Sequence, residues 1–273
     1  MSAAPTWERQ DAVAPSLVRR RQTFFELLWM WCLRDVRVRY KQSFLGVLWA
    51  ILQPLALMVM FTVIFSYLAP VPSGGIPYPL FSYTGVLPWS LFAAMIVAGV
   101  PSLAANITLV TKVKMPREII PVGVALANLA DFGVASILFV GMFLFYQITL
   151  SWTVLWVIPL LVIQTVLALG VVLLGAALNV IYRDIRFIVP LAMQLWMYAS
   201  PIIYPVDLVP EQWRLLYFLN PMAATIDGYR RVLLLGVAPD HTALAFALAV
   251  SALLFVLGLG VFRKLEPTFA DII

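Results

Sequence analysis

The chain has 273 residues, of which 63% are hydrophobic and only 11% are charged. Globular proteins carry about 25% charged residues, so this composition excludes an ordinary soluble domain and indicates an integral membrane protein. A single cysteine, Cys32, and a single histidine, His241, exclude an intrachain disulfide and a His/Cys metal cluster. The net charge of +5 requires no nucleic-acid partner, because Lys and Arg beside membrane segments account for it.

The first 41 residues are polar and basic, and carry eight Lys or Arg. Residues 1–22 lack the apolar core of a signal peptide, and we expect a mobile cytoplasmic tail. In residues 23–41 apolar side chains recur at helical spacing while charges gather in the second half. This segment is too charged to cross a membrane, so we predict an amphipathic helix that lies at the inner interface.

An uncharged run from Gln42 to Thr111 follows, without Asp, Glu, Lys, Arg or His. We predict two membrane spans in it, at about 44–68 and 80–110. Between them, residues 69–79 hold four prolines and two glycines and must form a turn. The second span is longer than a bilayer requires and contains Pro88, where we expect a kink or an interfacial first turn.

Four further spans are predicted beyond this run, at 119–147, 154–180, 188–204 and 243–262. Charged islands at 111–118 and 181–187 separate them, and a tail covers 263–273. The amphipathic stretch 205–240 is broken by prolines into pieces too short to cross, so we expect two short re-entrant or interfacial helices there. The sequence therefore predicts an all-α membrane protein with six transmembrane helices.

Six spans place both termini on one side of the membrane. The N-terminal segment, the two charged islands and the tail hold fifteen Lys and Arg, against three in the opposite loops. Because positive loops stay inside, both termini are expected in the cytoplasm.

Motifs for catalysis are missing from the sequence. It contains no GxxxxGK[ST], HExxH, CxxC or GxSxG pattern, so this chain cannot hold ATP phosphates by the P-loop mechanism. We therefore expect no catalytic residue, no metal and no cofactor on this chain.

Several polar and aromatic residues have both a structural and a functional reading. Asn128 and Asp131 share one helix face inside a span, and serve either a substrate path or a packing contact with a neighbouring helix. The charged islands either anchor the topology or bind a soluble partner. Arg230 and Arg231 contact lipid headgroups or the phosphates of an anionic lipid-linked substrate. The many aromatic residues form an interfacial belt, while some suit stacking on sugar rings.

Four stretches of sequence resemble one known family. They are RDVRVRYKQSFLGVLWAILQPL (34–55), KVKMPREIIPV (112–122), LNVIYRDIRFIVPLAMQLWMYASPIIYP (178–205) and YFLNPMAATIDGYRRVLL (217–234). The chain is similar over about residues 24–262 to ABC-2 type permeases, the membrane subunits of polysaccharide exporters for O-antigen, teichoic acid and capsule. The resemblance implies a homodimer in the bacterial inner membrane, with two copies of a separate ATPase subunit that binds ATP and Mg²⁺. It implies lipid-linked polysaccharide and membrane lipids as the other partners, and no nucleic acid.

The resemblance also assigns roles to residues of this chain. The contacts with the ATPase fall on Lys112, Lys114, Met115, Pro116, Arg117, Glu118, Arg183 and Asp184. The lipid phosphate is expected to enter near Arg34, Arg37, Arg39 and Lys41. Candidate walls of a glycan channel are Trp49, Tyr67, Tyr83, Trp89, Trp196, Tyr198 and Tyr204.

The expected function is export of a lipid-linked polysaccharide, foremost of the O-antigen type. Teichoic acid, capsule, a small lipid or a drug are alternative cargoes of the same family. An ion-coupled transporter that depends on Asp131, and a non-transport scaffold in a biosynthetic complex, are rivals from other classes.

Overall fold

The computed structural model describes residues 17–41, 45–106 and 115–269, and within these ranges every regular element is a helix. Lys112 and Lys114 lie outside the described residues. The side chains of residues 17–22 and 215 are likewise not described.

Five helices are long and apolar enough to cross a bilayer by length and composition. They are α2 (Trp49–Val63) with its flanking turns Gly46–Leu48 and Ile64–Leu68, α3 (Tyr78–Ala105), α5 (Ile119–Phe145), α6 (Val157–Ile181) with the turn Trp152–Trp156 before it, and α10 (His241–Leu265) with the turn Glu266–Thr268 after it. Each begins within two residues of the predicted start. α3 runs without a break through Pro88, where a kink or a separate first turn is predicted.

The predicted span 188–204 corresponds to a shorter helix, α7 (Ile185–Tyr198). Its 14 residues reach about 21 Å, less than the ~30 Å of a hydrocarbon core. The chain leaves the helix at Ala199 because Pro201 and Pro205 follow, and neither can donate a backbone hydrogen bond. Residues 205–240 then form two short helices, α8 (Glu211–Tyr217) and α9 (Pro221–Leu233).

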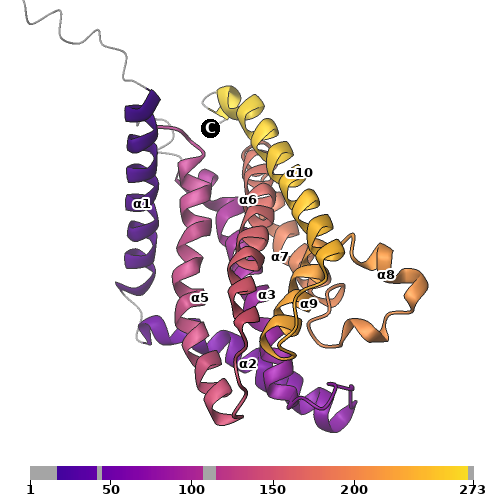
Figure 1. Ribbon diagram of the computed structural model, residues 1–273. Helices are drawn as coiled ribbons and strands as arrows, with labels where there is room; N and C mark the ends of the chain where they lie inside the picture. Colours follow the sequence, from indigo (N-terminus) through magenta and orange to yellow (C-terminus); the bar gives the residue numbers. More distant parts are fainter. Residues whose placement is uncertain (1–16, 42–44, 107–114, 270–273) are drawn as a thin grey trace, which may run out of the picture.

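The first helix, α1 (Leu17–Lys41), runs alongside α5, with its axis close to that of α5 (Figure 1). A helix lying flat in the interface would instead cross the ends of the spans, so its direction differs from the prediction. Close packing holds it there: a Cβ at Gly123 would lie 2.5 Å from the indole ring of Trp31, so only glycine admits this contact. α2 crosses the other helices at a steep angle behind α5 and α6 (Figure 1).

The interior is centred on α3, which packs against α2, α5, α6, α7 and α9. Its buried side chains join those of α6 and α9 in the largest apolar cluster, with Phe92, Met95 and Leu167 fully enclosed. α6 and α10 approach closely, since a Cβ at Gly170 would lie 2.6 Å from the backbone nitrogen of Phe255. The start of α1, the start of α5 and the end of α10 lie at one end of the bundle (Figure 1).

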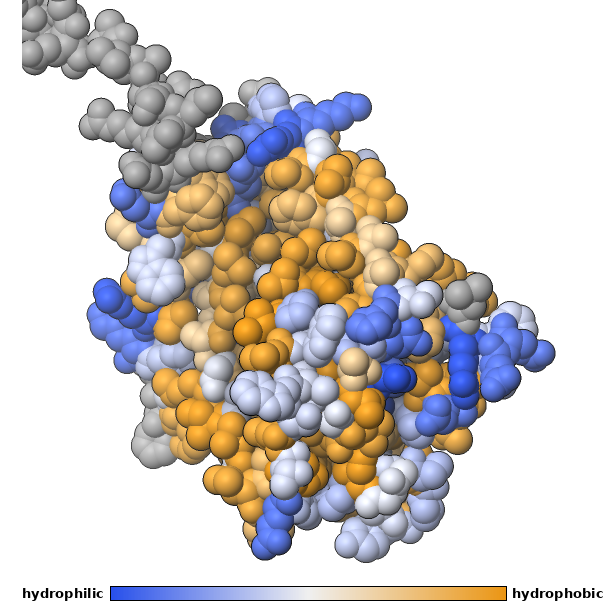
Figure 2. All heavy atoms as spheres, viewed as in Figure 1, coloured by the Kyte–Doolittle hydropathy of each residue, from blue (hydrophilic) through white to orange (hydrophobic). Residues whose placement is uncertain are grey.

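The surface has the distribution expected of a membrane protein. Apolar residues cover most of the face shown in Figure 2, while hydrophilic residues gather at the end that holds the C-terminus and around α8. This pattern fits a multi-pass membrane protein, because lipid-facing helices expose large apolar side chains such as Phe187 and Val256.

Candidate functional site

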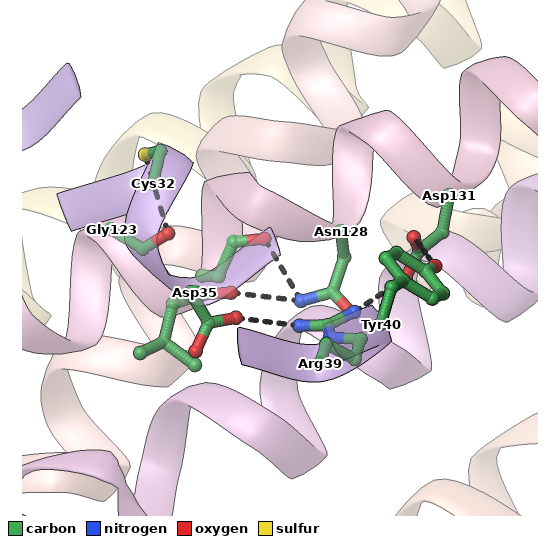
Figure 3. A network of polar contacts seen from close by, with 9 residues as sticks. Cys32, Asp35, Arg39, Tyr40, Gly123, Asn128 and Asp131 are labelled. Carbon is green, nitrogen blue, oxygen red and sulfur yellow. Dashed lines mark hydrogen bonds and ion pairs between the residues drawn. The ribbon is translucent and has the colours of Figure 1, made fainter. Parts of the chain in front are cut away.

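A network of polar side chains joins α1 to α5 (Figure 3). The guanidinium of Arg39 donates to the carboxylate of Asp131 and, at 2.9 Å, to the amide oxygen of Asn128. It also forms an ion pair of 2.8 Å with Asp35 one turn earlier on α1. The hydroxyl of Tyr40 donates to the second carboxylate oxygen of Asp131. The predicted intramembrane polar pair is therefore satisfied by the end of α1.

The network combines one guanidinium, that of Arg39, with two carboxylate groups. Burial by itself would lower the pKa of Arg39, but Asp131 and Asp35 raise it above its ordinary value. Burial, together with Asp131, raises the pKa of Tyr40, so its hydroxyl stays a donor. With one guanidinium between two carboxylates, the network carries about one negative charge. Arg39 is thus not a free cation, although the sequence placed it among the residues that receive a lipid phosphate.

A cavity of about 800 Å³ lies next to this network, bounded by α1, α2, α3 and α5. Its polar end is formed by Arg39, Tyr40, Asn128 and Asp131. Two of the predicted channel aromatics, Trp49 and Trp89, line it together with Gln53, Ser90, Phe132 and several small or aliphatic residues. The structure therefore brings together members of three predicted sets: the basic segment, the intramembrane polar pair and the aromatic residues.

The other cations of the basic segment stay at the surface. Arg34, Arg37 and Lys41 are exposed on α1. The guanidinium of Arg34 stacks over the ring of Trp31, 4.3 Å from its centroid. These three side chains remain able to meet an anion from outside, whereas Arg39 is paired.

The segment before α5 is tied to the C-terminal end of the chain. Arg117 donates to the backbone oxygen of Glu266, and Glu118 lies 3.7 Å from Arg263 in an ion pair. Met115 packs against the apolar cluster that contains Phe262 and Phe269. The exposed Pro116 lies in the turn between Met115 and α5. Residues predicted to contact the ATPase thus hold the start of α5 and the end of α10 together.

The second predicted contact lies between α6 and α7. Arg183 and Asp184 are both exposed there. Within the described part of the chain, neither side chain has a hydrogen-bond or ion-pair partner. Both are therefore available to another protein.

The remaining predicted aromatics fall into three environments. Tyr83 is fully buried between α3 and α5, where it donates to the backbone oxygen of Ala135 at 3.0 Å, so it is a packing contact. Trp196 donates to Asn220 at 2.9 Å and packs edge-on against Phe92. The open surface holds Tyr67 and Tyr198, while Tyr204 shares a 3.1 Å hydrogen bond with Tyr217.

Arg230 has neither of the roles considered for it from the sequence. It is buried, donates at 2.7 Å and 3.0 Å to the backbone oxygens of Ile202 and Tyr204, and stacks 3.7 Å above the ring of Phe81. Burial lowers its pKa to about 10, so it stays charged near neutral pH. Its place inside the protein excludes contact with headgroups or a substrate phosphate in this state. It instead fastens the turn after α7 to α3 and α9.

Comparison with known proteins places this arrangement in a family. The model of the ABC-2 type transporter matches residues 26–234, which run from α1 to the end of α9. The chain belongs to the ABC-2 type transporter family. It is 32% identical over 252 residues to an O-antigen export system permease protein RfbA from Klebsiella pneumoniae, covering 91% of this chain and 95% of that protein.

Two further relatives extend the comparison. The chain is 30% identical over 258 residues to an O-antigen export system permease protein RfbA from Myxococcus xanthus, covering 93% and 98% of the two chains. It is 22% identical over 244 residues to the polysialic acid transport protein KpsM from Escherichia coli, covering 86% and 91%. The matched region of this ABC-2 chain includes the whole α1–α5 network and the adjacent cavity.

Sequence reasoning missed several residues of the site in this ABC-2 chain. It did not select Asp35, Tyr40 or Gln53, and it did not pair Arg39 with Asp131. A lone carboxylate within a span does signal that a partner is required, because an unpaired charge is costly there. Four cations of the basic segment could supply that partner, and only the packing of α1 on α5 selects Arg39.

Proposed function

We propose that this chain is the membrane subunit of an ATP-driven exporter that moves a lipid-linked polysaccharide of the O-antigen type across the bacterial inner membrane. The proposal rests mainly on the two relatives with that printed name, at 30% and 32% identity over more than nine-tenths of the chain. The cargo of the more distant polysialic acid relative makes a capsule polysaccharide the second candidate. Teichoic acid, a small lipid and a drug have no comparable support.

The assembly in this proposal is a homodimer with two copies of an ATPase subunit, which supplies ATP and Mg²⁺. ABC-2 membrane chains work with a separate ATPase, and this chain carries no P-loop sequence of its own. In this proposal α7, with residues 199–204, completes six spans within the assembly. Both termini then face the cytoplasm, as the excess of Lys and Arg at that end favours.

The geometry supports a route by which the ATPase moves the membrane helices. Residues 115–118 sit at the start of α5, and Arg183 with Asp184 lies at the start of α7. About 20 Å along α5, at ~1.5 Å per residue, Asp131 holds α1 through Arg39. A push on the first turn of α5 therefore moves α1 and the wall of the cavity together.

An ion-coupled transporter is not favoured by the site. Both carboxylate oxygens of Asp131 accept hydrogen bonds from Arg39 and Tyr40, whereas a path for protons or ions would require a carboxylate open to the transported ion. Dependence of transport on an ATPase partner separates the two classes.

Reconstitution tests the proposed function. Proteoliposomes that contain this chain and its ATPase subunit are loaded with a fluorescent polyprenyl-diphosphate-linked glycan. ATP-dependent movement of the glycan to the opposite leaflet is expected, and it should stop when the ATPase is omitted. Movement that follows an imposed proton gradient without the ATPase would overturn the proposal.

A further inference from the structure

The cavity beside the α1–α5 network has polar groups that the protein itself leaves unpaired. Trp49, Gln53, Trp89 and Ser90 all line it. Within the described part of the chain, none of their side chains makes a hydrogen bond. Trp49 and Gln53 are exposed, so the polar groups of this wall are open to water or to a ligand that can hydrogen-bond. A lipid tail, which has no hydrogen-bonding groups, would leave the polar part of this wall without a partner.

The charge of the cavity opposes an anionic occupant. Its only described cation is Arg39, whose guanidinium is held by Asp131, Asp35 and Asn128. Three of the five guanidinium N–H groups already donate to these side chains, and a phosphate that reached the other two would lie beside two carboxylates. A neutral ligand that donates hydrogen bonds meets no such repulsion. Asp131 still has acceptor capacity for one, because a carboxylate offers about four lone-pair sites and two are used.

The lining combines flat aromatic faces with planar polar groups. An indole face stacks on the C–H face of a sugar ring, while the carboxylate and amide oxygens accept from its hydroxyls. Asp131, Asn128 and Gln53 supply these oxygens, and Trp49 and Trp89 supply the rings. The volume of about 800 Å³ lies within the range of small-molecule sites, roughly 300–1,000 Å³.

We propose that this cavity binds a sugar residue of the lipid-linked glycan, within a single protomer and separately from the lipid phosphates. This inference rests on the proposed function and names the part of the substrate that the cavity recognises. The phosphates stay outside, at the exposed cations Arg34, Arg37 and Lys41 of α1. The protein thus recognises the substrate in two places. The exposed cations of α1 contact the phosphates, and the cavity behind α1 contacts the hydroxyl groups of the sugar.

Binding of two lipids to the full-length chain in nanodiscs tests the inference. One probe is a tritiated polyprenyl diphosphate that bears a disaccharide, and the other is the same lipid without sugar. The wild-type chain should bind the sugar-bearing lipid about tenfold more tightly, the factor expected from one good aromatic contact with added hydrogen bonds. Trp49→Leu and Gln53→Leu should remove most of this difference, and Trp49→Tyr should restore part of it.

Two controls accompany this binding measurement. Trp152→Leu removes an exposed indole outside the cavity and should leave both affinities unchanged. The sugar-free lipid should bind all these variants equally, which also shows that they are folded. Equal affinity of the wild-type chain for the two lipids would overturn the sugar site while leaving the exporter function standing. Failure of both lipids to bind, with no ATP-dependent glycan movement, would overturn both proposals.

Discussion

Arg39 and Asp131 are 92 residues apart in the chain and form an ion pair that fastens α1 to α5. Both side chains are about three-quarters buried, and both line the same cavity. The pair therefore connects the segment proposed to meet the ATPase with the wall of the proposed sugar site.

A double-mutant cycle on this pair should show coupling. Arg39→Ala and Asp131→Ala each remove the same ion pair and leave a partly buried charge behind, so the double variant should destabilise the protein by less than the sum of the two single substitutions. The expected coupling free energy is about 0.5–3 kcal/mol, measured by equilibrium unfolding in mixed micelles. Arg37→Ala, an exposed residue of the same helix, is the control. Strict additivity of the two single substitutions would contradict the role of the pair.

Cys32 reports whether α1 is docked on α5. Its thiol donates to the backbone oxygen of Gly123 at 3.3 Å, and burial, with Asp35, raises its pKa. A raised pKa lowers the thiolate fraction, so maleimide labelling of the folded protein should be slow and should accelerate as the pH rises. Asp131→Asn weakens the docking and should speed labelling several-fold, with the pH profile displaced to lower pH. An unchanged labelling rate in Asp131→Asn would show that α1 stays docked without the ion pair.

Arg230 should be important for stability and not for binding an anion. Arg230→Ala leaves two buried backbone oxygens without donors and should cost about 3 kcal/mol of unfolding free energy. Arg230→Lys keeps the charge but loses the forked geometry, so it should restore only part of that stability. Arg231→Ala serves as the matched control, since Arg231 bonds only to the exposed oxygen of Ala238, and should cost about 0.5 kcal/mol or less. A stable Arg230→Ala protein would contradict this role.

The crossing of α6 and α10 should not tolerate a methyl group. Gly170→Ala places its Cβ against the backbone of Phe255 and should destabilise the protein by about 1–3 kcal/mol. Gly260→Ala adds the same methyl where no atom lies within 4 Å, and should be neutral or slightly stabilising because alanine favours helix. Thermal unfolding of the two variants side by side measures the contrast, and equal melting temperatures would argue against the close crossing.

The exposed loop between α6 and α7 should bind the ATPase. Arg183→Glu with Asp184→Lys reverses both exposed charges without removing a contact inside the described chain. We expect unchanged thermal stability but at least a fivefold loss of ATPase co-purification, because charge-assisted contacts are lost and like charges meet. Glu211→Lys, on α8 away from this loop, should have no effect on co-purification. Normal co-purification with the double variant would remove this loop from the interface.

The coupling segment itself is tested by the triple substitution of Lys114, Met115 and Arg117 with alanine. ATP hydrolysis should then continue while glycan export falls, because the motor no longer moves α5. Export at the wild-type rate would contradict the coupling role.

The amino-acid sequence by itself determined where the long apolar helices run, the family and the absence of ATP-binding motifs. Partition into lipid depends on the composition of windows of about 20 residues, so span starts were predictable to within two residues. α7 was the exception, since its helix ends at Tyr198, ahead of Pro201, while the apolar stretch runs on to Tyr204.

The tertiary structure alone decided which side chains meet. Helices such as α3 are apolar on every face, so their sequence carries no periodic pattern to show which face packs where. The choice of Arg39 as partner of Asp131, the burial of Arg230 and Tyr83, and the cavity between α1, α2, α3 and α5 all follow from contacts between distant segments. The uncharged run from Gln42 to Thr111 thus defined a membrane protein, while the packing of α1 against α5 defined a site.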